Sequence, residues 1–222
     1  MKTSSSASTY LNLALAAFAL LGLELVLVVV EPYLPVEPGT VHAALTHWLI
    51  TTLVWASGAV SLVAWARRRT DFFVSPPVRL PVSPARWSAI GGLVVLTVAG
   101  QLMLRGGVLA PVAEHGALTE RFGDAGTVAW IAQVVYYVAE LGVMALIVAF
   151  GQRAGEIRFG RTRVPWGGMT LGVTWGLVHF LTQDAATGVY GIVLSLIMGT
   201  IYVLAGRRLR LTLPILLALF LI

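Results

Sequence analysis

Long apolar stretches separated by short polar connections run along almost the whole chain. Most of them reach the roughly 20 residues that an α-helix needs to cross the hydrocarbon core of a bilayer. None shows the alternation of apolar and polar positions that is typical of a β-barrel strand, so we expect an all-α, polytopic transmembrane helical bundle. The seven predicted spans are residues 9–30, 41–66, 87–104, 127–150, 166–183, 188–205 and 211–222.

The first and the last apolar stretches differ from the others in length or position. The stretch at 9–30 is longer than the roughly 7–15 apolar residues of a signal peptide, and no small-x-small cleavage site follows it, so we expect a retained span. The stretch at 211–222, LTLPILLALFLI, is much shorter than the others. It is predicted to be a short last span, a re-entrant segment, or a span truncated relative to related proteins.

The composition agrees with a membrane protein. Hydrophobic residues make up 58% of the 222 positions and charged residues only 11%, whereas a soluble domain carries about 25% charged residues. Because so much apolar surface does not fit inside one small fold, lipid must solvate much of it, and we expect a single membrane domain over 1–222. The absence of cysteine excludes disulfides, Cys-ligated zinc and iron–sulfur clusters.

The basic residues are strongly asymmetric. All but two of the 15 Lys and Arg residues fall on one side of the predicted spans, in short clusters between apolar runs. This placement indicates anchored helix ends rather than a nucleic-acid surface, and it predicts a cytoplasmic N-terminus in a prokaryotic cytoplasmic membrane. The residues on that side are Lys2, Arg67, Arg68, Arg69, Arg79, Arg86, Arg153, Arg158, Arg161, Arg163, Arg207, Arg208 and Arg210; Arg105 and Arg121 lie on the other.

Polar and ionisable side chains gather in the half of the bundle away from the arginine clusters. A charged side chain costs about 2.5–3.5 kcal/mol at the centre of a bilayer on insertion scales, so ionisable residues there suggest a function. Gln133, Tyr137 and Glu140 are spaced i, i+4, i+7 and share one helical face. We expect an outward-facing polar pocket with Glu140 at its floor. Candidate pocket residues are Glu24, His47, Gln133, Tyr136, Tyr137, Trp175 and Gln183, and candidate catalytic residues are Glu140 and His179.

The fifth predicted span combines polar and small residues. Trp175 and His179 lie on one face of it, and Gly168, Gly172 and Gly176 recur every fourth position. This small-residue ladder predicts close approach of another helix.

Several candidates also have structural explanations. Tyr136 and Tyr137 are equally well read as core tyrosines, and His47 as a buried histidine that bonds its neighbours. A hydrogen bond between Glu140 and His179 would stabilise a bundle without doing any chemistry.

The stretch from Trp175 through "LTLPILLAL" resembles the last third of the CPBP (CAAX-processing and bacteriocin-processing, or abortive-infection) intramembrane proteases. Trp175-x-x-x-His179 corresponds to the family motif Phe-x-x-x-His, and Glu140 takes the place of the first glutamate of Glu-Glu-x-x-x-Arg. The resemblance implies a glutamate- and histidine-dependent intramembrane endopeptidase. In such a site a carboxylate in an apolar pocket acts as general base on water, and histidine positions that water or stabilises the oxyanion.

The chain departs from the family at three positions. Leu141 replaces the second glutamate, Ala145 replaces the arginine, and no His-x-x-x-Asn/Asp motif occurs near Ala218. The resemblance therefore implies either a divergent protease or an inactive relative that still binds a transmembrane segment or peptide.

Two other function classes compete with this interpretation. His47 and His179 are predicted at similar depth on different spans, which suits b-type haem or a metal ion, with Glu24 or Glu140 as an oxygen ligand. A transporter or structural membrane subunit is the third hypothesis. The apolar inner halves of the spans favour a one-sided site over a conduit.

Overall fold

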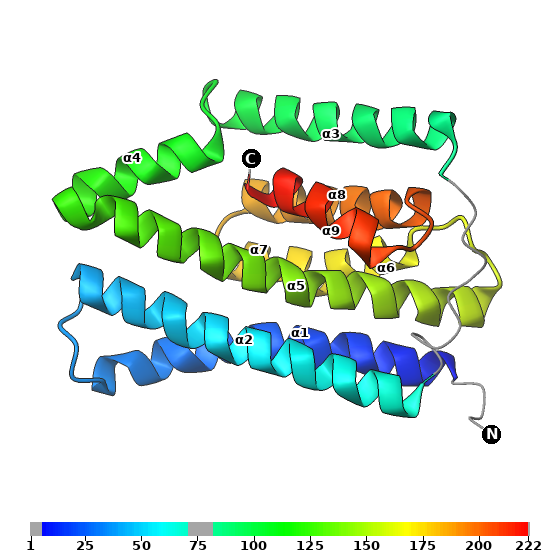
Figure 1. Ribbon diagram of the computed structural model, residues 1–222, viewed down its shortest axis with the longest axis horizontal. Coiled ribbons are helices and arrows are strands. Elements are labelled where there is room, and N and C mark those ends of the chain that lie inside the picture. The colour runs from blue at the N-terminus through cyan, green and yellow to red at the C-terminus, as the bar shows by residue number, and fades with distance from the viewer. Residues whose placement is uncertain (1–5, 71–81, 222) are drawn as a thin grey trace.

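A computed structural model describes residues 6–70 and 82–221, and within these residues the chain is helical and contains no strand. The long helices run along one common direction, parallel or antiparallel to one another (Figure 1). The helices are α1 (Ala7–Val30), α2 (Val41–Arg69), α3 (Pro84–Leu104), α4 (Ala110–Phe122), α5 (Gly126–Phe159), α6 (Trp166–Leu171), α7 (Leu177–Thr182), α8 (Ala185–Leu204) and α9 (Leu209–Leu221), with short turns η1 (Glu31–Tyr33), η2 (Gly123–Ala125) and η3 (Gly172–Gly176).

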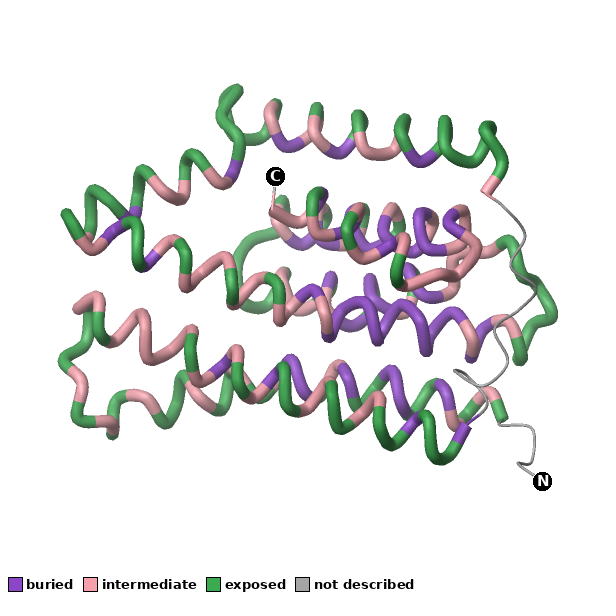
Figure 2. Tube along the Cα trace, viewed as in Figure 1, coloured by how far each residue is buried: buried purple, intermediate pink, exposed green. Residues whose placement is uncertain are grey.

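Five helical segments of the described chain are long and apolar enough to cross a membrane, and α9 is a shorter apolar helix. Large apolar side chains stay exposed on the outer faces of the bundle. Val29 and Val95 are 68% exposed and Val60 is 70% exposed, and exposed positions line the outside of α2 and α3 (Figure 2). These features are consistent with an integral membrane protein whose outer surface contacts lipid.

The helices confirm the all-α prediction but differ from the predicted spans in detail. α5 continues to Phe159, nine residues beyond the predicted end of the fourth span. The predicted fifth span, 166–183, is not one regular α-helix, because a π-helical turn, η3, separates α6 from α7. Lys2 and Arg79, which contributed to the predicted orientation, lie outside the described residues.

The core lies around the C-terminal half of α5. This helix packs against α1, α2, α6 and α9, and nearly every side chain from Leu141 to Gly155 is buried. Figure 2 shows this buried segment beside the buried turns of α6 and α8. The half of the bundle nearest the arginine clusters is therefore tightly packed and largely apolar, with Gln152 as a buried, hydrogen-bonded exception.

The small-residue ladder does bring another helix close, as predicted. A Cβ atom at Gly176 would lie 3.1–3.2 Å from atoms of Ile192 on α8, and one at Gly168 would lie 2.7 Å from the carbonyl oxygen of Ser195. On the opposite side, a Cβ at Gly199 would collide with the backbone of Gly168. Glycine is required at this crossing because the two backbones touch.

The arginine-bearing ends of α2 and α5 and the turn between α8 and α9 lie at the same end of the bundle (Figure 1). Two hydrogen bonds of Arg207 join the α8–α9 turn to the end of α5 and the loop after it. Arg207, which adopts a φ of 61°, donates from Nε to Glu156 Oε1 at 2.5 Å and from Nη2 to the carbonyl oxygen of Thr162. Arg207 thus links the turn after α8 to Glu156 at the end of α5 and to Thr162 in the loop after α5.

Candidate functional site

A cavity of about 870 Å³ lies in the half of the bundle away from the arginine clusters. It forms because α5 packs closely on α6 but makes few contacts with α7, so α5 and the second half of the fifth span diverge. Eight of the nine candidate residues line this cavity: Glu24, Gln133, Tyr136, Tyr137, Glu140, Trp175, His179 and Gln183.

The π-helical turn explains this divergence. In η3 the backbone bonds run from i to i+5, which widens the helix and rotates the residues beyond it relative to those before it. α6 therefore packs on α5, while α7 is directed away from α5 and toward α8. Such turns are frequent at functional sites, and this one contains Trp175.

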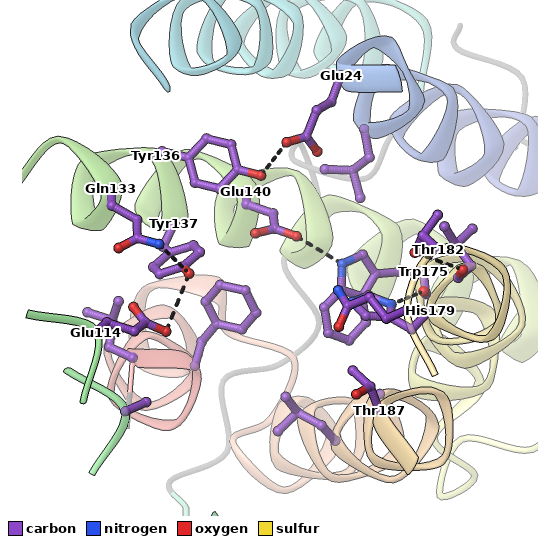
Figure 3. Close-up of a pocket in the computed structure, with 18 of the residues that line it drawn as sticks. Glu24, Glu114, Gln133, Tyr136, Tyr137, Glu140, Trp175, His179, Thr182 and Thr187 are labelled. Carbon is purple, nitrogen blue, oxygen red and sulfur yellow. Dashed lines mark hydrogen bonds between the residues drawn. The ribbon is translucent and has the colours of Figure 1, made fainter. Parts of the chain in front are cut away.

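Trp175 stands between the two candidate catalytic residues. Its indole Nε1–H donates to Glu140 Oε1 at 2.9 Å, and its ring centroid lies 4.3 Å from that of His179, with the planes inclined at 62°. Figure 3 shows the three side chains in this order around the opening. The link between Glu140 and His179 therefore passes through Trp175.

The hydrogen bond of His179 fixes which ring nitrogen is free. Nδ1 lies 2.8 Å from the carbonyl oxygen of Trp175, which only accepts, so Nδ1 carries the proton. In the neutral ring, Nε2 then holds a lone pair for a ligand or a water.

A second group of polar contacts lies on the α1–α2 side of the cavity. The hydroxyl of Tyr136 donates to Glu24 Oε1 at 2.6 Å, and His47 Nε2 lies 3.2 Å from the same oxygen. The other ring nitrogen, His47 Nδ1, is 2.5 Å from Glu31 Oε1. Both nitrogens of His47 therefore face carboxylates, and Glu31 belongs to the same chain of contacts.

His47 is the one candidate that does not line the main cavity. It lines a separate cavity of about 350 Å³ beside Glu31 and Thr40. Because both its ring nitrogens are engaged, it has no free lone pair to share with His179 across a haem or metal ion. In the described part of the chain, no group of three His, Cys, Asp or Glu residues is arranged to hold a metal.

The cavity wall between α4 and α5 includes residues that the sequence patterns did not single out. Gln133 Nε2 donates to the Tyr137 hydroxyl at 3.0 Å, and that hydroxyl donates to Glu114 Oε1 at 3.4 Å. Glu114 lies on α4, which folds back along α5 after a turn at Gly123. The pair Gly123 and Asp124 is a turn signal in the sequence that could have indicated this hairpin. Further lining residues that were missed are Gln101, Arg105, Trp130 and Tyr190.

The positions that depart from the CPBP motifs lie away from the polar wall. Leu141 and Ala145 are each 2% exposed and pack in the apolar core. In place of a polar motif on the last helix, Phe220 lines the cavity, with its ring centroid 5.8 Å from that of Tyr137 and 6.1 Å from that of Trp175. This wall of the site is thus apolar.

Comparison with protein-family models, with curated proteins and with solved structures finds no match to this chain. The resemblance to CPBP proteases therefore rests on the residues around Glu140, Trp175 and His179 alone.

Proposed function

We propose that this chain is a CPBP-like integral membrane protein that binds an apolar peptide or the end of a transmembrane segment in the cavity beside Glu140 and Trp175. One observation carries the proposal. Gln133 and Trp130 line the cavity, and their buried atoms Oε1 and Nε1 have no hydrogen-bond partner in the described structure. An unsatisfied buried acceptor or donor costs about 1–3 kcal/mol, so a ligand that supplies both partners gains affinity.

A peptide group matches this pair because each one offers an N–H donor and a carbonyl acceptor. The remaining walls come largely from apolar side chains such as Phe18, Leu21, Leu25 and Phe220. Apolar side chains of a ligand can rest on these walls while its backbone meets the polar atoms.

We place the protein in a prokaryotic cytoplasmic membrane with seven spans and a cytoplasmic N-terminus. The gathering of arginine-bearing ends on one side of the bundle supports this orientation. The count takes α6, η3 and α7 together as one span and includes α9. At that arginine-bearing end, the closely packed core from Leu141 to Gly155 favours a one-sided binding site over a transport path.

Binding is tested with the protein in phosphatidylcholine nanodiscs and a dansyl-labelled Leu/Ala hexapeptide, followed by fluorescence titration. We expect Gln133→Leu and Trp130→Phe each to weaken binding about tenfold, because each removes one of the two unpartnered groups. Trp87→Phe is the matched control, since Trp87 is 45% exposed on α3. Unchanged affinity in both cavity variants contradicts the proposal.

Peptide-bond hydrolysis in the same cavity is the second candidate function. It is favoured by the free Nε2 of His179 and by the Glu140 carboxylate, whose Oε1 accepts from Trp175. Glu140 would take one proton from water as that water attacks the carbonyl carbon, and His179 Nε2, which accepts, would hold the water through its other hydrogen. The proton then passes to the leaving amine as the C–N bond breaks.

Cleavage of the same labelled peptide tests this second candidate. Glu140→Gln and His179→Ala should each lower the cleavage rate by at least about 100-fold, while Glu140→Gln keeps an oxygen acceptor for Trp175 and retains binding. His42→Ala serves as the control, because His42 is exposed and does not line the cavity. Binding without measurable cleavage by the wild type identifies a binding protein rather than a protease.

A further inference from the structure

A chain of three side chains borders the cavity where α3 meets α8. Arg105, at the end of α3, donates from Nε to Gln101 Oε1 at 3.3 Å. Gln101, which is only 7% exposed, donates from Nε2 to the hydroxyl oxygen of Tyr190 on α8. All three residues line the main cavity, yet neither the peptide-binding nor the hydrolytic proposal uses them.

The direction of these hydrogen bonds leaves an unused donor group on Arg105 and another on Tyr190. The Gln101 amide accepts from Arg105 and donates to Tyr190, so both of its ends are used. The Tyr190 oxygen accepts, which leaves its own O–H proton to donate elsewhere. Among the described residues, the terminal nitrogens of Arg105 and the hydroxyl proton of Tyr190 have no acceptor. The Arg105 guanidinium and the Tyr190 hydroxyl are therefore held in place, and each keeps a donor that is free to bind a ligand.

The positive charge of Arg105 is a second observation on this group. Arg105 is the one Lys or Arg side chain among the described residues that line this cavity. Glu114 lines it too, and its carboxylate is close enough to be attracted by the Arg105 charge, but that carboxylate accepts from Tyr137 and makes no direct ion pair with Arg105 among the described residues. The guanidinium therefore makes no direct ion pair in the cavity, and its terminal nitrogens remain available to an anion.

We propose that Arg105 and Tyr190 bind an anionic end group, a carboxylate or phosphate, of the ligand that occupies the cavity. The inference rests on the proposed binding function and narrows its ligand to an apolar body with one anionic end. For a peptide, that end is the terminal carboxylate. Guanidinium binds carboxylate and phosphate through two parallel hydrogen bonds, and Gln101 positions both donors.

A purely structural role for these residues is to hold α3 against α8. Ile90, Thr97 and Gln101 are the buried residues of α3 among those described, so this helix depends on few contacts. A structural role predicts that substitutions lower stability without changing which end group the ligand prefers. The experiment therefore compares two ligands that differ only in charge.

The probes are the dansylated Leu/Ala hexapeptide as a free acid and as its C-terminal carboxamide, titrated into the protein in phosphatidylcholine nanodiscs. We expect the wild type to bind the free acid about tenfold more tightly. Arg105→Gln should bind both forms equally, at the affinity of the carboxamide. Arg105→Lys should keep part of the preference, because it retains charge but loses the paired geometry. Arg121→Gln is the matched control, because Arg121 does not line this cavity.

The outcomes separate the two proposals. Equal binding of the two peptides by the wild type, or an undiminished preference in Arg105→Gln, overturns the anionic site and leaves the binding function standing. Failure of both peptides to bind overturns both proposals.

Phosphatidylglycerol added to the nanodiscs identifies the natural source of the anion. Displacement of the free acid in the wild type but not in Arg105→Gln assigns the site to a lipid phosphate, and retention of the free acid assigns it to a terminal carboxylate.

Discussion

The indole N–H of Trp175 donates to the carboxylate of Glu140 across the place where two helices diverge, with Nε1 and Oε1 2.9 Å apart. Trp175 lies on the π-helical turn and Glu140 on α5. The same tryptophan offers its backbone oxygen to His179. One residue thus orders both candidate catalytic side chains, and it lines the cavity.

Trp175→Phe should therefore destabilise the protein and weaken peptide binding. The substitution removes the donor to Glu140 and leaves a partly buried carboxylate without it, which costs about 1.5–3 kcal/mol for a bond to a charged group. Thermal and denaturant unfolding of the purified protein measures the loss. Trp166→Phe is the control, because the Trp166 N–H donates to the Arg161 carbonyl oxygen at an exposed site. Equal losses in the two variants would contradict a special role for Trp175.

His47→Ala should destabilise the joint between α1 and α2. His47 lies between Glu24 and Glu31, and its removal leaves two carboxylates without the group that faces them both. We expect a loss of about 1–3 kcal/mol in the free energy of unfolding. His42→Ala, on an exposed position of the same helix, should change stability little. A loss no larger than that of His42→Ala would show that the cluster is not stabilising.

Gly199→Ala should separate α8 from α6. Its new methyl group would collide with the backbone of Gly168, which cannot move as a flexible side chain can. Overpacking of this kind costs about 1–3 kcal/mol. Gly142→Ala on α5 is the opposite case, since nothing lies within 4 Å of its added Cβ, and a helical Gly→Ala change gains about 0.5–1 kcal/mol. The free energies of unfolding of Gly199→Ala and Gly142→Ala, each measured against the wild type, test the expected loss in the first and the expected gain in the second.

Asp184 gives a pH-dependent prediction outside the spans. It caps α8 by accepting from the Thr187 backbone N–H at 2.9 Å, and hydrogen bonds from the backbone and the hydroxyl of Thr187 hold the pKa of this carboxyl below its ordinary value. A lowered pKa in the folded state stabilises the protein above the pKa of the unfolded chain, and this contribution is lost as pH falls.

Asp184→Ala should therefore lower the melting temperature at neutral pH. The difference from the wild type should narrow as pH falls through the lowered pKa. Asp184→Asn keeps a capping oxygen and should lose less than alanine at neutral pH. A difference between wild type and Asp184→Ala that stays constant with pH would contradict a role for the carboxylate charge.

The candidate residues were found in sequence because polar groups stand out in apolar spans. Glu24, Gln133, Glu140 and His179 were each visible as exceptions within such a span, and the structure brings all four to one cavity. Their partners were not predictable from spacing. The sequence left open whether Glu140 meets His179, and in the structure Glu140 accepts its hydrogen bond from Trp175, because the π turn changes which side chains face α5.

Other contacts depend on how distant segments fold back on each other. Glu114 reaches Tyr137 only because α4 folds back along α5, and Arg105 reaches Tyr190 through Gln101 only because α3 lies beside α8. Apolar periodicity tells which residues are helical, but it does not order the helices around one another. These residues were therefore missing from the predicted site.

The amino-acid sequence by itself determined that this protein is helical and that its outer surface suits lipid. The reason is local, because a long apolar segment in lipid satisfies its backbone hydrogen bonds only within its own helix. The tertiary structure alone decided that α5 and α7 diverge, that Trp175 joins Glu140 to His179, and that Arg105 borders the same cavity. Those relationships depend on packing between segments far apart in the chain, where single glycines and one wide helical turn set the distances.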